Sequence, residues 1–392
     1  MTPTRSAAVY TESNSRDETK ANSAMQGRHF SELDTPTYCV DLDTMAANMA
    51  AMSTFIKSHK KQWRPHVKCH KIPDIAHLQL QHGAIGVTSA KTSEAEVFIR
   101  AGIESVLIAN MIIGEAKLER VASLCHIGKP IIAIDHFVQA EALAEVCRRH
   151  SVTCDVIIEL NVGLDRVGVR PGSDALDLAR GIDGLPGIQI RGIMGYEGHL
   201  CAVTDQEEKR RGIEASMGRL ERIRDDMLRS GICCDIVSAG GTATYQMTSE
   251  HPAVTELQCG GGIFADPFYT GPCQVQGLES ALRLTATVVS RPCLERAVLD
   301  VGRKSLHPDI YPPVIHSTIS GRPLPDILSM KYSAEHLTVQ LGPESQYLTI
   351  GDKVQIIPGY SDHTTTLHST LYGLRNGYVE TVWPIAARGC LQ

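Results

Sequence analysis

The sequence predicts an α/β protein: a (β/α)8 TIM-type barrel over residues 34–283, followed by a smaller, mostly-β domain over residues 284–392. Eight short strand-like runs alternate with amphipathic helical stretches, and most of these runs are nearly continuously apolar, as expected for a parallel sheet buried on both faces. After about Leu284 this alternation stops, and strand-like runs broken by Pro and Gly follow one another. Residues 1–33 contain too little to bury and are expected to be a flexible tail.

The strand and helix candidates follow in chain order. The expected barrel strands are residues 63–68, 85–90, 106–110, 131–135, 156–160, 190–196, 234–240 and 255–262. Helical spacing of apolar residues is clear in residues 92–102, 140–150 and 214–231. Residues 35–43 read as a strand that could join either domain. A doubly wound open sheet is the alternative, but no G-x-G-x-x-G motif follows an early strand, which disfavours it.

Composition and charge limit the classes of function. The formal net charge is −6, which argues against a nucleic-acid or membrane-surface partner. No apolar run reaches 18 residues, and the first 30 residues lack the apolar core of a signal peptide. The 12 cysteines are scattered without zinc-ribbon spacing, so reduced thiols and a cytoplasmic protein are expected.

Polar clusters follow the predicted strands at the ends where barrel enzymes keep their chemistry. The first strand ends in "HVKCHK", with His66, Lys68 and His70. The other clusters contain Arg166, the pair Tyr196 and His199, the loop "SAGGT" (residues 238–242) and the run "CGGG" (residues 259–262). A water-facing rim would produce one or two such coincidences rather than five, so a site built around a lysine is favoured.

The glycine-rich loop after the seventh strand suggests a phosphate site. Ser238, Gly240, Gly241 and Thr242 offer hydroxyl groups and backbone that can approach an anion closely. Such loops are common, but this one occurs together with a lysine on the first strand. Pyridoxal phosphate fits both features, because its aldehyde forms a Schiff base with a lysine and its phosphate needs a cradle.

Several motifs carry a family resemblance. "RPHVKCHK", "NVGLDRVGV", "GYEGH", "SAGGTATY", "TELQCGGGIFAD" and the terminal "NGYVETVWPIAARG" resemble the D-threonine aldolase and D-serine dehydratase family. These are fold-type III pyridoxal-phosphate enzymes with a barrel related to that of alanine racemase. The resemblance extends from Thr35 to Gly389.

The resemblance implies roles for the residues of the clusters. Lys68 would carry the cofactor, Arg166 would lie by its phenolic oxygen, and Lys71 would be a structural or solvated cation. The loops with Ser238, Gly240, Gly241, Thr242, Gly260 and Gly261 would hold the phosphate. His66 would lie near the cofactor or be a hydrogen-bonded core histidine, Tyr196 would line the pocket, and His199 is a candidate base.

The sequence departs from the family at a second motif in the β domain. Family members place a histidine and, two residues later, an acidic residue or cysteine on a divalent metal, whereas "PGYSDH" has Tyr360 where that histidine is expected. Asp362 remains and His363 follows it, so a Mn, Mg or Zn ion is possible but in doubt. His363, His368 or His307 could supply the missing nitrogen. Alternatively the metal is absent and Tyr360 is itself an acid or base.

These observations predict a pyridoxal-phosphate-dependent lyase, an aldolase that cleaves or forms the Cα–Cβ bond of β-hydroxy-D-amino acids. A D-amino-acid dehydratase and a racemase using Tyr360 are the alternatives. A non-catalytic pyridoxal-phosphate carrier is a further one, disfavoured because such proteins lack a second domain. The expected partners are an amino-acid substrate and a second copy of the chain, with the β domain completing the active site of a homodimer.

Overall fold

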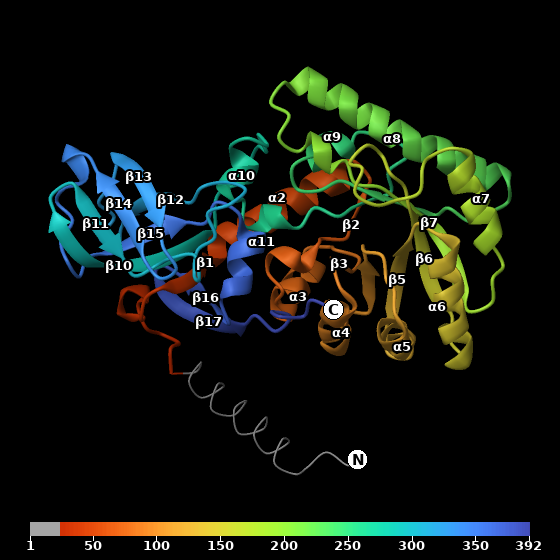
Figure 1. Ribbon diagram of the computed structural model, residues 1–392, viewed down its shortest axis with the longest axis horizontal. Helices are drawn as coiled ribbons and strands as arrows, with labels where there is room; N and C mark the ends of the chain where they lie inside the picture. The colour runs from red at the N-terminus through yellow and green to blue at the C-terminus, as the bar shows by residue number, and fades with distance from the viewer. Residues whose placement is uncertain (1–23) are drawn as a thin grey trace, which may run out of the picture. The chain divides into compact units, whose positions relative to one another are not determined.

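The computed structural model describes residues 24–392, and they form two compact units (Figure 1). The barrel unit contains Ala46–Ser280, Ser361–Thr366 and Ala386–Gln392. The β unit contains residues 24–45, Ala281–Tyr360 and Leu367–Ile385. The division after Ser280 lies near the one predicted after residue 283. Residues 1–23 of the predicted tail lie outside the described residues.

The barrel unit is built on one parallel sheet of eight strands, in the order β2-β9-β8-β7-β6-β5-β4-β3. Isolated parallel bridges pair Trp63 with Ala84 and His66 with Thr88, and so close the ring between the β2 and β3 segments. The strands are β2 (Gln62–Trp63), β3 (Val87–Ser89), β4 (Ser105–Ile108), β5 (Lys129–Ile134), β6 (Cys154–Glu159), β7 (Ile188–Met194), β8 (Ile236–Ala239) and β9 (Glu256–Leu257).

Helices alternate with these strands along the chain, and Figure 1 shows α4 to α8 along the outside of the sheet. The helices are α2 (Leu42–Ser58), α3 (Pro73–Gln81), α4 (Thr92–Arg100), α5 (Glu115–Leu124), α6 (Phe137–Arg149), α7 (Ser173–Ile182), α8 (Gln206–Arg229), α9 (Tyr245–Thr248) and α10 (Pro267–Thr270). A later segment of the chain adds the helical turn α11 (Ser361–Thr364) to this unit. Short 3-10 turns follow some strands: η2 (Val67–Cys69), η3 (Gly198–Leu200) and η4 (Gly261–Ile263). None of the helices in residues 24–392 is long and apolar enough to cross a membrane.

Side chains from four neighbouring strands form one cluster of the core. Leu107, Ile131, Ala133, Ile157 and Met194 are all buried there. Because side chains alternate along a strand, Glu159 lies on the same face of β6 as Ile157. A cluster of apolar side chains therefore gives way to charged groups at the carboxyl ends of the strands.

The β unit contains a mostly antiparallel sheet of nine strands. Its strands are β1 (Thr37–Asp41), β10 (Leu282–Cys293), β11 (Arg296–Leu299), β12 (Val314–Thr318), β13 (Ile327–Tyr332), β14 (Leu337–Leu341), β15 (Lys353–Ile357), β16 (Thr370–Arg375) and β17 (Tyr378–Pro384). It also contains the 3-10 turns η1 (Phe30–Glu32) and η5 (Pro343–Ser345), and η6 (Thr365–Leu367) runs into it from the barrel unit.

The two sheets confirm the predicted fold class, and one alternative that the sequence left open is now resolved. The predicted strand at residues 35–43 is β1, and it joins the β unit by pairing with β10 and β16. The segment Gly27 to Leu33, expected to belong to the tail, is held on the β unit by backbone bonds such as Gly27 N–H to Val379 O at 2.8 Å.

The first barrel strand is shorter than the predicted residues 63–68. Regular pairing stops at Trp63, although the N–H groups of Arg64 and His66 still donate to β9 and the residue after it. Pro65 between them has no N–H to donate. Val67 to Cys69 then form the turn η2, which is capped by the His66 side chain.

Candidate active site

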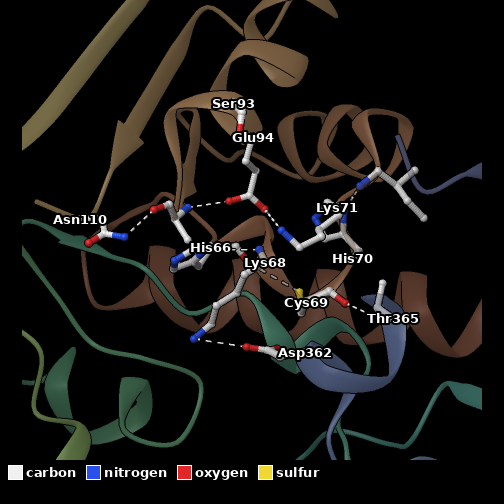
Figure 2. Close-up of polar contacts among 12 residues, drawn as sticks. His66, Lys68, Cys69, His70, Lys71, Ser93, Glu94, Asn110, Asp362 and Thr365 are labelled. Carbon is white, nitrogen blue, oxygen red and sulfur yellow. Dashed lines mark hydrogen bonds and ion pairs between the residues drawn. The ribbon is translucent and has the colours of Figure 1, made fainter. Parts of the chain in front are cut away.

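Lys68 lies in the turn η2, at the carboxyl end of the first barrel strand. Its side chain is 42% exposed, and its Nζ lies 3.2 Å from Oδ2 of Asp362 in an ion pair, which Figure 2 shows. The amine is thus accessible, although both chain neighbours, Val67 and Cys69, are buried. The Lys68 amine is therefore open to a ligand at this end of the barrel.

Asp362 reaches Lys68 because a distant segment of the chain returns to the barrel unit as α11. Two contacts fix this segment: the N–H and hydroxyl of Ser361 donate to Asp266 at 2.8 and 2.7 Å, and Thr365 Oγ1 donates to Cys69 O at 2.8 Å. Burial raises the pKa of Asp266 to about 8, and the bonds from Ser361 oppose that shift. The segment that carries Asp362 is therefore held on both sides of this residue, at Ser361 by Asp266 and at Thr365 by Cys69.

Lys71 follows three residues after Lys68 but is buried and fully paired. Its Nζ lies 2.6 Å from Oε1 of Glu94, and the N–H of Ala90 donates to the other oxygen of that carboxylate at 2.6 Å (Figure 2). Lys71 has a positive φ of 57°, and its N–H donates to Val67 O, in the turn η2, at 2.8 Å. It is a structural cation, one of the two roles expected from the resemblance.

His66 and His70 flank the lysine turn, and both imidazoles are kept neutral near pH 7. Burial, together with the charges of Lys68, Lys71 and Arg166, lowers the pKa of His66 well below its usual value. Burial also lowers the pKa of His70 to about 3, and its Nδ1 accepts the N–H of Ile72 at 3.0 Å. His66 is therefore a neutral hydrogen-bonding group next to Lys68.

Arg166 lies in the loop after β6 and faces two groups. Its guanidinium lies 3.9 Å from Oε1 of Glu159 and 5.6 Å from the centre of the Tyr196 ring. Glu159 is the last residue of β6 and is buried, and its Oε2 has no hydrogen-bond partner among the described residues. Burial raises the pKa of Glu159 to about 7, although Arg166 opposes the shift.

Tyr196 and His199 follow β7. The hydroxyl of Tyr196 lies 3.3 Å from the thiol of Cys201. His199 is exposed on the turn η3, and its ring lies so close to Gly163 that a Cβ there would be 2.8 Å away. His199 therefore lies against the loop that carries Arg166.

The loop after β8 is arranged around Glu197, a residue that the sequence analysis did not single out. The hydroxyl of Thr244 and that of Thr248 each donate to Glu197 Oε1 at 2.6 Å. The Gly240 N–H donates to Oε2 of Glu197 at 3.4 Å, and the Gly241 N–H donates to the Thr244 hydroxyl at 3.2 Å. Gly240 and Gly241 thus bond within the protein, whereas the N–H groups of Thr242 and Ala243 have no acceptor among the described residues.

The loop after β9 lies beside it and also offers unused donors. Gly260 lets the backbone pass the lysine strand, because a Cβ there would lie 2.0 Å from His66 O. The N–H groups of Gly261 and Gly262 have no acceptor among the described residues. Added Cβ atoms at Gly241 and Gly261 would lie 2.8 and 2.7 Å from the rings of Tyr196 and Tyr269.

These residues fit pyridoxal phosphate. Two neighbouring loops present unused N–H groups, on Thr242 and Ala243 in one and on Gly261 and Gly262 in the other. Glycine leaves room in both loops, because a Cβ at Gly241 or Gly261 would meet a tyrosine ring, and glycine-rich backbone with free N–H groups binds phosphate. Lys68, whose amine is accessible, follows β2, and β2 is the neighbour of β9 in the barrel sheet. Ser238 lies below the loops, where its hydroxyl accepts a bond from Gln258 at 2.9 Å.

A metal site does not assemble from the residues expected to form one. Within residues 24–392 no three His, Cys, Asp or Glu side chains come together as a metal-binding group. Asp362 and His363 are neighbours on the helical turn α11 rather than on an extended strand, and Asp362 pairs with Lys68. Tyr360, His307 and His368 belong to the β unit.

Sequence reasoning missed Glu159, Glu197 and Asp266. Each lay inside or beside a motif already noted, and each is buried. A single carboxylate that closes an apolar strand, as in "VIIEL", is the signal that could have drawn attention to Glu159. Asp266 has no comparable signal, because its partner Ser361 lies far along the chain.

Comparison with known proteins identifies related families. The family model for the alanine racemase N-terminal domain matches residues 40–267, and a model for a serine dehydratase domain matches residues 281–374. D-threonine aldolase from an Arthrobacter species is 33% identical over 370 residues, covering 93% of this chain and 96% of that protein. The 3-hydroxy-D-aspartate aldolase of Paracoccus denitrificans (strain Pd 1222) is 31% identical, covering 93% and 95%.

Solved structures have the same fold. The crystal structure of D-threonine aldolase from Filomicrobium marinum matches with a TM-score of 0.89 and 32% identity, over 94% of this chain and 99% of that one. D-threo-3-hydroxyaspartate dehydratase from Delftia sp. HT23 matches with a TM-score of 0.83 over 91% and 98%, and at 23% identity it supports the fold alone.

Proposed function

This chain belongs to the alanine racemase N-terminal domain family, among the relatives of D-threonine aldolase, and we propose that it is a pyridoxal-phosphate-dependent lyase that cleaves β-hydroxy-D-amino acids. The products are an aldehyde and glycine or a substituted glycine. The D-configuration follows from these relatives, D-threonine aldolase and 3-hydroxy-D-aspartate aldolase.

The observation that carries the proposal is the position of the Lys68 amine. It is 42% exposed at the carboxyl end of the barrel, in the turn that follows β2. The neighbouring strand β9 and the next strand β8 precede the two loops with unused N–H groups. Lys68 would hold the cofactor covalently, and Thr242, Ala243, Gly261 and Gly262 would hold its phosphate. Arg166, which is exposed beside Tyr196, is available to the phenolic oxygen.

The bound cofactor supplies an electron sink for the bond broken at Cα. In an aldol cleavage the Cα–Cβ electron pair stays with Cα, the β-hydroxyl loses its proton, and Cα gains a proton. His199 is the candidate base for the hydroxyl proton, because it is an exposed imidazole on the turn after β7. Neutral His66 donates or accepts a hydrogen bond without adding positive charge beside Lys68.

Dehydration is the second candidate, and one observation favours it. The model that matches residues 281–374 describes a serine dehydratase domain, and a D-threo-3-hydroxyaspartate dehydratase is 28% identical over 71% of this chain. In that reaction Cα–H breaks and the β-hydroxyl leaves, with Lys68 as the candidate base. Racemisation through Tyr360 and a non-catalytic carrier role are further outcomes for the same assay to distinguish.

The test is a product assay with purified enzyme on D-threonine, 3-hydroxy-D-aspartate, D-serine and D-alanine, with L-threonine as a control. The proposal predicts glycine with acetaldehyde from D-threonine, or glycine with glyoxylate from 3-hydroxy-D-aspartate. A Lys68→Ala variant should form neither. Ammonia with a keto acid would instead support the dehydratase, and Cα–H exchange without cleavage would support the racemase.

Three further parts of the proposal need separate measurements. Residues 24–392 contain no metal-binding group of three His, Cys, Asp or Glu side chains, so turnover should persist after treatment with a chelator, and loss of turnover that Mn²⁺ restores would contradict this. A homodimer should have about twice the 42.7 kDa mass of the chain by light scattering.

A cytoplasmic location and the absence of nucleic-acid and membrane partners stay predictions, to be tested by cell fractionation.

A further inference from the structure

Glu197 is a buried carboxylate with an unusual set of partners. It follows Tyr196 at the carboxyl end of β7, and its exposed fraction is 0%. Among the ion pairs of residues 24–392 none includes Glu197; its partners are two threonine hydroxyls and one N–H. Burying a carboxylate is costly unless several donors compensate it, and here three neutral donors do so.

All three donors belong to one segment, the loop after β8 and the helix α9. Oε1 holds the hydroxyls of Thr244 and Thr248, each at 2.6 Å, and Oε2 accepts the Gly240 N–H. Glu197 therefore connects the end of one barrel strand to the loop that follows the next strand. An apolar side chain could fill the same space, but it would leave these donors buried without acceptors.

The bonds of Glu197 decide which N–H groups of the loop remain available. Gly240 donates to Glu197, and Gly241 donates to Thr244, whose own proton goes to Glu197. Next along the chain, Thr242 and Ala243 keep N–H groups without an acceptor among the described residues, whereas Thr244 and Tyr245 donate to Gly241 O at 3.1 and 2.9 Å. The loop thus presents two adjacent N–H groups, and Glu197 holds its start in place.

The negative charge of Glu197 has a buried cation nearby. Lys209 donates to Cys201 O at 3.2 Å and to Cys273 O at 2.9 Å. Burial lowers the pKa of Lys209, and the neighbouring charge of Glu197 partly opposes this shift. Lys209 is therefore close enough for its charge to interact favourably with that of Glu197.

We infer that Glu197 is the positioning residue of the cofactor phosphate: it fixes the loop after β8 so that the N–H groups of Thr242 and Ala243 face the ligand. The inference rests on the proposed function and adds a specific role to it. Glu197 does not touch the phosphate in this account. Its loss should weaken binding of a phosphorylated ligand and leave binding of the same ligand without its phosphate unchanged.

The test compares two ligands on cofactor-stripped protein. Dissociation constants of pyridoxal phosphate and of pyridoxal, which has the aldehyde but no phosphate, are measured by fluorescence titration. For Glu197→Ala the constant for pyridoxal phosphate should rise about tenfold or more, whereas that for pyridoxal should change less than about threefold. Glu197→Gln should fall between the wild type and Glu197→Ala, because its amide keeps one acceptor oxygen.

Two further variants separate positioning from general destabilisation. Glu256→Gln changes another buried carboxylate of the barrel, one that pairs with Arg64, and the ratio of its two dissociation constants should match the wild type. Thr244→Val removes the hydroxyl that links Gly241 to Glu197, and it should shift the ratio in the same direction as Glu197→Ala. Thr244→Val and Glu197→Gln also serve if Glu197→Ala does not fold.

The outcomes are distinct. Equal weakening of both ligands in the Glu197 and Thr244 variants, or no weakening at all, would overturn the inference and leave the proposed function standing. Wild-type protein that binds neither ligand would instead overturn the proposed function.

Discussion

Charged side chains are paired more closely at one end of the barrel than at the other. At the end where β4 and β9 begin, Arg64 Nε lies 2.9 and 3.1 Å from the two oxygens of Glu256, and the guanidinium also donates to Ser105 at 2.7 Å. Arg64 and Glu256 are both buried. Arg64 and Glu256 therefore neutralise each other.

At the carboxyl ends of the strands the pairing is looser. Arg166 lies 3.9 Å from Glu159, whose second oxygen has no partner among the described residues, and Lys68 is 42% exposed beside Asp362. Removing one partner of the closed pair at the first end would leave a buried charge unpaired, whereas the open pairs at the second end leave charge for a ligand. This agrees with the rule that barrel enzymes keep chemistry at the carboxyl ends.

The largest expected effect follows loss of the Lys68 amine. Lys68→Ala should lower turnover roughly 10³-fold or more, because no other amine would hold the cofactor. Its free energy of unfolding should change by less than about 1 kcal/mol, since the ion pair with Asp362 is partly exposed. Steady-state kinetics and urea unfolding measure both quantities, and Lys57→Ala, at an exposed lysine on α2, is the matched control. Equal losses in the two variants would refute the assignment.

Loss of the Arg64–Glu256 pair, at the other end of the barrel, should lower stability and leave turnover unchanged. Glu256→Gln leaves Arg64 buried without a charged partner and should lower the free energy of unfolding by about 3 kcal/mol. Turnover per folded molecule should stay close to that of the wild type. Urea unfolding and active-site titration separate the two effects. A Glu256→Gln variant that is as stable as the wild type but inactive would contradict the assignment of this pair to stability and not to function.

Because Glu159, at the carboxyl ends of the strands, is buried, it should make the free energy of unfolding depend on pH. Its folded-state pKa is raised to about 7 from an ordinary value of 4.5, so the folded protein holds a proton that the unfolded chain releases between these values. The stability this proton contributes is present at low pH and is lost as the pH rises through about 7.

The measurement is urea unfolding of cofactor-free wild type and Glu159→Gln from pH 5 to pH 8. The wild type should lose about 2 kcal/mol relative to the variant over this range. Other titrating groups are common to both proteins and cancel in the difference. A difference that does not vary with pH would show that Glu159 titrates normally.

The smallest expected effect concerns Asp362. Asp362→Asn removes the charge that faces Lys68 but keeps the shape of the side chain, so stability should change by less than about 1 kcal/mol. The rate at which cofactor-free protein takes up pyridoxal phosphate should change, because the amine loses its counter-ion. An unchanged rate would indicate that the ion pair has no part in cofactor loading.

Much of the barrel was predictable because its strands are buried on both faces. Residues 131–135 and 156–160 read as continuous apolar runs, and β5 (Lys129–Ile134) and β6 (Cys154–Glu159) overlap them. The ends of parallel strands meet at one edge, so Lys68, Arg166 and Tyr196 could be grouped without a structure. The shortened first strand was less predictable, because Pro65 permits extended backbone while removing one donor.

Long-range pairings were beyond the sequence. Asp362 was noted as a metal ligand, but nothing local shows that α11 returns to the barrel unit and faces Lys68. The helical form of residues 361–364 was also missed, because "YSDHTTT" has no apolar period. Glu197 was inside the quoted motif "GYEGH", yet a charged loop residue normally indicates exposure rather than a buried acceptor.

The most direct test of the account is mass spectrometry of the freshly purified enzyme after borohydride reduction and proteolysis. Reduction converts a lysine–pyridoxal linkage to a stable amine, so the modified peptide reports the residue. A phosphopyridoxyl group is expected on Lys68, and Lys71 should be unmodified. Modification at Lys71 or elsewhere, or no modification after incubation with pyridoxal phosphate, would contradict it.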